Sequence, residues 1–92
     1  MADTKGFTIG SEWQQIMQGA TGFAIQLKNS CEIEVHYNDS NAEPTDGSPT
    51  VNIGNQTNSP KFLSVAGFTK GKVTAWARSV TDKPAEIVVL TT

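Results

Sequence analysis

Residues 21–38 read TGFAIQLKNSCEIEVHYN, and the alternation within this stretch decides the fold. Apolar side chains occupy every second position in residues 23–27 and again in residues 31–37, with mostly polar side chains between them. The apolar positions are Phe23, Ile25, Leu27, Cys31, Ile33, Val35 and Tyr37. A period of two is typical of strands that bury one face. Because Asn29 and Ser30 lie between the two runs, we expect the strands to form a hairpin.

The same pattern continues along the chain, with turn-rich segments between the apolar runs. It predicts a short edge strand at residues 50–53 and further strands at residues 61–66, 72–79 and 85–91. Residues 85–91 are apolar on both sides, which is typical of a strand in the middle of a sheet.

Residues 11–19, SEWQQIMQG, fit two structures. Ser11 begins a pattern that resembles a helix-capping box, and the apolar residues after it have helical spacing. However, Trp13, Gln15 and Met17 also alternate. Since the rest of the chain predicts strands, a strand is the favoured interpretation.

The predicted fold class is all-β: a small antiparallel β-sandwich or jelly-roll-like barrel of six or seven short strands. The length is that of one domain, so residues 1–92 are expected to form a single β domain. Its N-terminal segment, residues 1–10, is expected to be less regular.

Composition and charge disfavour several classes of function. The formal net charge is -2, and no cluster of Lys and Arg carries interleaved aromatic residues. We therefore expect neither nucleic acid nor an anionic membrane as a partner. The N-terminus lacks the basic and apolar segments of a signal peptide, so we expect a protein that is made in the cytoplasm and either stays there or leaves without a Sec signal. With Cys31 as the only cysteine, an internal disulfide and a thiolate zinc site are excluded.

Glu32, Glu34 and His36 raise the question of a metal or catalytic site. They are two residues apart, so they project from one face of a strand with about 7 Å between neighbours. A metal site needs a further ligand, and a catalytic carboxylate needs burial, and the sequence supplies neither. Cys31 points to the opposite face, so His36 cannot activate it. A solvated strand face is favoured, and we expect no catalytic residue, no metal and no cofactor.

Residues 39–49, DSNAEPTDGSP, indicate a long exposed loop. The spacing of its acidic residues differs from that of an EF-hand, so a calcium site is not favoured. A loop of this length in a small domain suggests a contact surface. We expect deletion of Asn41 to Gly47 to leave the fold intact and to weaken binding of a partner.

The two tryptophans raise the question of carbohydrate binding. Trp13 is expected in the core. Trp76 falls on the polar side of residues 72–79, opposite Ala75 and Ala77. Its ring therefore serves a ligand, a subunit contact or, if the alanines face outward, the core.

Charge is unevenly distributed along the chain. Residues 32–46 hold five acidic and no basic residues, whereas residues 61–83 hold five basic residues and one acidic residue. Either the acidic region of one copy meets the basic region of the next and closes a ring or trimer, or both regions face solvent. The candidate partner-binding residues are Asp39, Asn41, Glu43, Asp46, Lys72, Trp76 and Arg78.

Several loose motifs follow one another from Trp13 onward. They are a W-x-x-I at Trp13, a glycine and apolar strand at residues 22–28, a V-x-Y strand and proline-containing loop at residues 35–44, and GKVTAWAR at residues 71–78 before a closing VVL. This order resembles the small β-rich virion proteins of tailed bacteriophages. That group includes capsid decoration (cement) proteins, head fibres and tail-associated β-domains.

The resemblance implies a non-enzymatic structural protein, often trimeric, that binds a repeated site on the virion. It carries over no catalytic residues. We therefore expect a capsid decoration protein that is made in the host cytoplasm, binds the major capsid protein or another virion protein, and acts as a homotrimer. The alternative is a carbohydrate- or host-receptor-binding module on a phage tail or fibre. It would use Trp76 and the two Asn-rich loops, residues 39–49 and 54–60.

Overall fold

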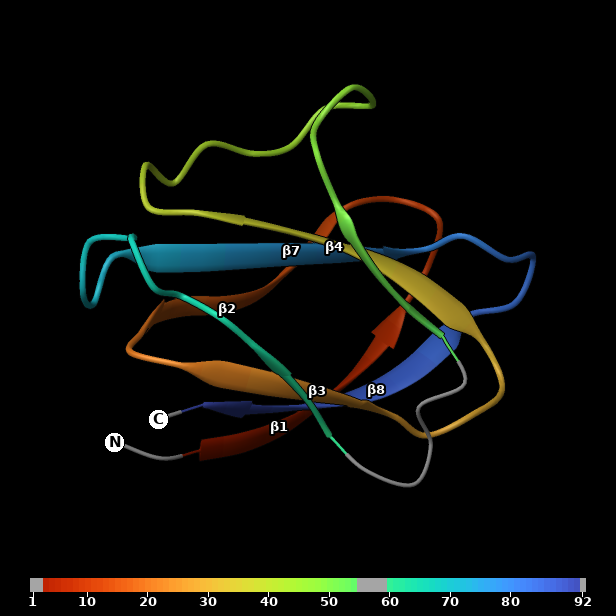
Figure 1. Cartoon of the computed structure of the whole chain (residues 1–92). Helices are drawn as coiled ribbons and strands as arrows, with labels where there is room; N and C mark the ends of the chain where they lie inside the picture. Colours follow the sequence, from red (N-terminus) through yellow and green to blue (C-terminus); the bar gives the residue numbers. More distant parts are fainter. Residues whose placement is uncertain (1–2, 55–59, 92) are drawn as a thin grey trace.

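The computed structural model describes residues 3–54 and 60–91, and this part of the chain is all-β (Figure 1). Its strands are β1 (Asp3–Ile9), β2 (Gln14–Ala20), β3 (Phe23–Leu27), β4 (Glu32–Asn38), β5 (Val51–Gly54), β6 (Lys61–Leu63), β7 (Val73–Ser79) and β8 (Ala85–Thr91). They form two antiparallel four-stranded sheets with the strand orders β1-β8-β3-β6 and β2-β7-β4-β5. Successive strands lie in opposite sheets except β4 and β5, which share one, and this is the strand order of a jelly roll. The predicted fold class, a small antiparallel β-sandwich, is confirmed, although the described residues form eight strands rather than six or seven.

The core lies between the two sheets and contains the side chains that the alternation predicted. Ile25 and Leu27 of β3, Ile33 and Val35 of β4, and Ile87 of β8 are each at most 1% exposed. Burial of each such side chain stabilises the fold by about 1.5 to 3 kcal/mol. The opposite faces of both sheets point away from this core, and they carry the surfaces described below.

Residues 11–19 contain no helix, because β2 begins at Gln14. The predicted strand is confirmed and the helical alternative is wrong. Register shifts interrupt the pairing of β2 with β7 between Gln15 and Met17 and again between Gln18 and Ala20. The first irregularity allows Ile16 and Met17, which are adjacent, to be buried together. Two adjacent buried residues imitate the spacing of a helix.

The expected hairpin between residues 23–27 and 31–37 is wrong. β3 pairs with β6 and β8 in one sheet, while β4 pairs with β5 and β7 in the other. The segment between them therefore crosses from one sheet to the other. The side chain of Asn29 holds this crossing, since it donates to the carbonyl of Pro84 and accepts from the amide of Glu86, both at 3.1 Å.

The N-terminal segment also differs from expectation. Residues 3–9 form β1, which pairs with β8 along its whole length, from Asp3 opposite Thr91 to Ile9 opposite Ala85. β1 lies at the edge of its sheet, and few of the side chains on its buried face are large. Its apolar alternation is therefore short, and the strand is difficult to predict from sequence.

Two predictions about strand position are confirmed, and one length is not. β5 lies at a sheet edge, and β8 lies between β1 and β3. β6 covers only residues 61–63. Residues 55–59 of the second Asn-rich loop lie outside the described residues. The described residues contain no helix long and apolar enough to cross a membrane.

Candidate partner-binding surface

The outer face of the β2-β7-β4-β5 sheet is built where β4 and β7 run side by side. Their register places Glu34 opposite Arg78, His36 opposite Trp76 and Asn38 opposite Thr74. Val35 and Ala77, which alternate with them, are fully buried in the core, so the three pairs point away from it. The loop of residues 39–50, which we call the β4–β5 loop, arches over this face (Figure 1).

Asn38 ties the beginning of the β4–β5 loop to the end of β4. Its side-chain oxygen accepts from the backbone amides of Ser40 at 3.1 Å and Ala42 at 3.2 Å. Its side-chain nitrogen donates to the carbonyl of Ala42 at 2.8 Å and lies 3.1 Å from Nε2 of His36. One amide side chain thus fixes the first turn of the loop, as asparagine commonly does in turns.

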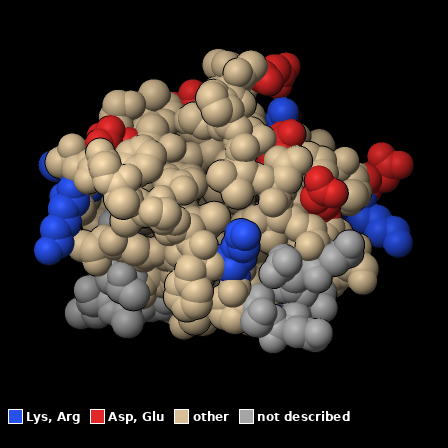
Figure 2. All heavy atoms as spheres, in the orientation of Figure 1, with Lys and Arg blue, Asp and Glu red and all other residues tan. Residues whose placement is uncertain are grey.

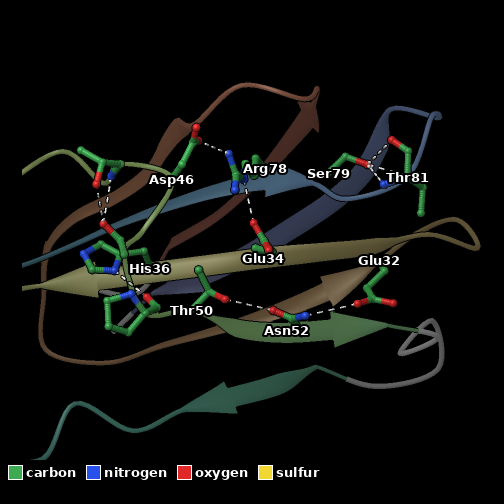
Figure 3. Close-up of polar contacts among 12 residues, drawn as sticks. Glu32, Glu34, His36, Asp46, Thr50, Asn52, Arg78, Ser79 and Thr81 are labelled. Carbon is green, nitrogen blue, oxygen red and sulfur yellow. Dashed lines mark hydrogen bonds and ion pairs between the residues drawn. The ribbon is translucent and has the colours of Figure 1, made fainter.

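His36 and Arg78 hold the second half of the loop (Figure 3). Nδ1 of His36 lies 2.8 Å from the carbonyl oxygen of Pro49. Because a carbonyl oxygen only accepts, Nδ1 carries the hydrogen, and Nε2 accepts from the Asn38 amide. Nη1 of Arg78 donates to Asp46 at 3.1 Å.

Trp76 lies beneath this loop and is only 5% exposed, although it is on the outer face of its sheet. Its ring centre is 6.4 Å from that of His36, and Pro44 of the loop is buried as well. Ala75 and Ala77 are in the core, so the interpretation in which they face outward is wrong. Because the β4–β5 loop arches over this face and Trp76 is nearly buried on it, we infer that the loop covers the ring. The sequence pattern did not predict this cover.

Trp13 is not part of the hydrophobic core, which corrects the expectation from sequence. It is partly exposed just before β2, and the guanidinium carbon of Arg78 lies 4.6 Å from its ring centre. A guanidinium over an indole face is a cation–π contact. The Nε1 of Trp13 is buried and has no hydrogen-bond partner among the described residues.

Arg78 connects β4 to the β4–β5 loop through two ion pairs. Its Nε donates to Glu34 at 2.7 Å, and both side chains are less than a quarter exposed. The hydrogen bonds that Arg78 donates to Glu34 and then to Asp46 raise the pKa of Arg78 further above its ordinary value. Asp46 is 97% exposed, so solvent screens its ion pair and the Glu34 pair is the stronger one.

Glu32, Glu34 and His36 do share one strand face, as predicted. Each has its own partner, however: Glu32 accepts from Asn52 at 3.4 Å, Glu34 from Arg78, and His36 contacts Pro49 (Figure 3). No group of three His, Cys, Asp or Glu side chains among the described residues is arranged to hold a metal.

The acidic and basic regions meet partly within one chain. Arg78 pairs with Glu34 and Asp46, and Asp39 accepts from the amide of Thr69 at 2.7 Å. That hydrogen bond lowers the pKa of Asp39. Carboxylates gather on the upper side of the molecule in Figure 2, over this sheet and its loop.

The candidate residues therefore fall into two groups. Asp39, Asp46, Trp76 and Arg78 hold the β4–β5 loop or lie beneath it. Asn41, Glu43 and Lys72 are exposed, and Asn41 has a left-handed backbone conformation with φ of 59°. Asn38 was missed, although an asparagine before D-S-N is a typical signal for a side-chain-stabilised turn.

Searches against protein-family models, curated proteins and solved structures gave no match to this chain.

Proposed function

We propose that this chain is a structural virion protein of a tailed bacteriophage, a capsid decoration protein that binds the phage head as an oligomer. The observation that carries the proposal is the way the β4–β5 loop is held. Asn38, His36 and Arg78 tether it to the sheet, while Asn41 and Glu43 remain exposed. A loop ordered before binding loses little conformational entropy when a partner docks, so it suits a repeated protein contact.

The jelly-roll strand order agrees with this setting. Jelly rolls are common in viral capsid proteins, but also in lectins and cupins, and a fold does not choose a function by itself. The motif order from Trp13 onward favours the virion. The partner is then the major capsid protein or another virion protein, and the resemblance favours a homotrimer.

The mechanism needs no chemical step. Each bound copy stabilises the assembled shell by mass action, in proportion to its occupancy of the site. The glycan-binding alternative requires an accessible Trp76 ring, and that ring is 5% exposed. No specific observation therefore favours the alternative.

The test is co-sedimentation of the purified protein with undecorated capsids of the phage that encodes it. We expect saturable binding, and Glu43→Lys should weaken it by about tenfold or more, as reversal of a contact charge does. Asp82→Lys is the matched control, since Asp82 is exposed in the turn between β7 and β8. A folded protein without affinity for the capsids would contradict the proposal.

Point variants are better suited to this test than deletion of Asn41 to Gly47. The deletion removes Pro44, which is buried, and Asp46, which pairs with Arg78. It would also uncover Trp76, so a loss of binding would then be difficult to separate from a loss of stability.

A further inference from the structure

The outer face of the other sheet, β1-β8-β3-β6, carries the most exposed large apolar side chain among the described residues. Phe62 of β6 is 80% exposed. It lies opposite Ala24 of β3, Ala24 lies opposite Leu90 of β8, and Leu90 lies opposite Thr4 of β1. These four side chains form one row across the sheet, which we call the Phe62 row. The aromatic ring stands at one end of it.

A second row crosses the same face about four residues along the strands. Thr8 lies opposite Glu86, and the amide of Lys28 donates to the carbonyl of Glu86 at 2.7 Å. Glu86 and Lys28 are both exposed and lie on neighbouring strands, β8 and β3. We call these residues the Lys28–Glu86 row.

A hollow of about 350 Å³ lies on this face over β1 and β8. Its lining includes Gly6, which has no side chain to fill it, together with Val88, Glu86 and Lys28. β1 is at the sheet edge opposite to β6. The face therefore has an aromatic projection at one edge and a hollow at the other.

These features match one another under a two-fold axis. Consider an axis nearly parallel to the strands that passes above the line between β8 and β3. It places β8 of one copy over β3 of the other, and β6 over β1. Each Glu86 then faces the Lys28 of the other copy. Each Leu90 lies over Ala24, which is already only 1% exposed within one chain and adds little contact area. Each Phe62 lies over Thr4 of β1, which is at the other end of the same row.

We propose that two copies of this chain associate face to face through the outer face of the β1-β8-β3-β6 sheet, with Phe62 as the anchor. The contact is isologous, so it closes at two chains. Two sheets stacked this way also keep their strands within about 30° of each other, as aligned sheet packing requires.

The size of the face sets the expected strength. β1 and β8 have seven residues each, β3 has five and β6 has three, so the face covers roughly 350 Å² on each copy. The total, roughly 700 Å², is below the usual size of specific complexes, so we expect a weak contact with a dissociation constant on the order of 100 µM. The β4–β5 loop belongs to the other sheet (Figure 1), so dimerisation leaves it accessible to a capsid.

The first experiment is sedimentation velocity of the whole protein from about 1 to 500 µM, a range that brackets the expected dissociation constant. The wild type should move from one chain to two. Phe62→Glu should raise the dissociation constant by about 100-fold or more, because it places a charge where the ring is buried. Val80→Glu is the matched control, since Val80 is 42% exposed in the β7–β8 turn, and it should dimerise as the wild type does.

A mixing experiment tests the axis itself. In a dimer of Lys28→Glu, each contact between positions 28 and 86 places two carboxylates opposite each other. In a dimer of Glu86→Lys, each such contact places two ammonium groups opposite each other. Each variant alone should therefore dimerise less well than the wild type. In a mixture, both contacts of a mixed dimer pair opposite charges. The mixture should therefore form mixed dimers at concentrations where each variant alone is monomeric. Interactions within one chain cannot produce that result.

Thermal unfolding of each variant by circular dichroism shows that it is folded. A wild type that stays monomeric, a dimer that survives Phe62→Glu, or a mixture that stays monomeric would each overturn the proposal. A trimer insensitive to Phe62→Glu would also overturn it while agreeing with the expected homotrimer. An assembly of six chains that separates into trimers on Phe62→Glu would support both the two-chain contact and the expected homotrimer. Capsid binding is measured separately, so its failure leaves the two-chain contact standing.

Discussion

The guanidinium carbon of Arg78 lies 4.6 Å from the centre of the Trp13 ring, on the outer face of the sheet that carries the β4–β5 loop. Arg78 also donates to Glu34, so its removal leaves a partly buried carboxylate without its partner. We expect Arg78→Ala to lower the free energy of unfolding by about 1.5 to 3 kcal/mol, measured by urea denaturation. Arg78→Lys should recover less than half of that loss, because an ammonium group lacks the planar fork.

Variants of Trp13 test the same cation–π contact from the side of the aromatic ring. Trp13→Phe keeps an aromatic face for Arg78 and removes an Nε1 that is buried without a partner. The two effects oppose each other, so we expect a change within about 1 kcal/mol. Trp13→Ala loses the ring altogether and should be clearly less stable. A large loss in Trp13→Phe would contradict this and would mean that Nε1 has a partner.

Asn38 should be the strongest single tether of the loop. It bonds to Ser40 and Ala42 and contacts His36, so Asn38→Ala releases the start of the loop. The expected loss of stability is about 1 to 3 kcal/mol. Hydrogen exchange followed by mass spectrometry should show faster exchange in residues 39–50. Asp82→Ala is the control, since Asp82 is exposed in the turn between β7 and β8, and it should leave that exchange unchanged.

Trp76 should behave as a buried residue in solution. Trp76→Ala should lower the free energy of unfolding by about 3 to 5 kcal/mol, the range for removal of a large buried aromatic ring. Glycan titration should leave the tryptophan fluorescence of the wild type unchanged. A fluorescence change that disappears in Trp76→Phe would contradict the loop-covered arrangement and would favour the receptor-binding alternative.

Alternation predicted the strands well because burial of one face has a period of two. It placed β3, β4, β7 and β8 close to their observed bounds and sent Cys31 inward and Glu34 outward. It could not assign strands to sheets. Both a hairpin and a crossing satisfy the same pattern in residues 21–38, and the choice depends on distant contacts, such as that between Asn29 and Glu86.

The candidate site was only partly predictable for a similar reason. The exposed position of Glu43 follows from a turn-rich composition. The burial of Trp76 does not, because it depends on a loop that folds back over an outer sheet face. Bonds between a side chain and a distant backbone atom, such as that from the amide of Thr69 to Asp39, have no local signature in the sequence.

Cys31 should react slowly with thiol reagents. Its side chain is 5% exposed, and the thiol donates to the side-chain oxygen of Asn29 at 2.8 Å. Burial raises the pKa of the thiol, so the reactive thiolate is scarce at neutral pH. Labelling with a chromogenic disulfide should become fast only in urea. Fast labelling of the native protein would show that the crossing at residues 28–31 opens readily.

Asp39 should make the stability of the molecule depend on acid. The amide of Thr69 donates to its carboxylate, which lowers the folded-state pKa below the ordinary value of 3.8. A group with a depressed folded pKa stabilises the fold fully above its unfolded pKa, and that stabilisation is lost as the pH falls through the folded pKa. We therefore expect the urea concentration at the midpoint of unfolding to decrease as the pH is lowered below about 4. The decrease should be smaller in Asp39→Asn. Asp82→Asn is the control, because exposed Asp82 should leave the acid dependence of the wild type intact. An identical acid dependence in Asp39→Asn and the wild type would contradict the role of the Thr69 contact.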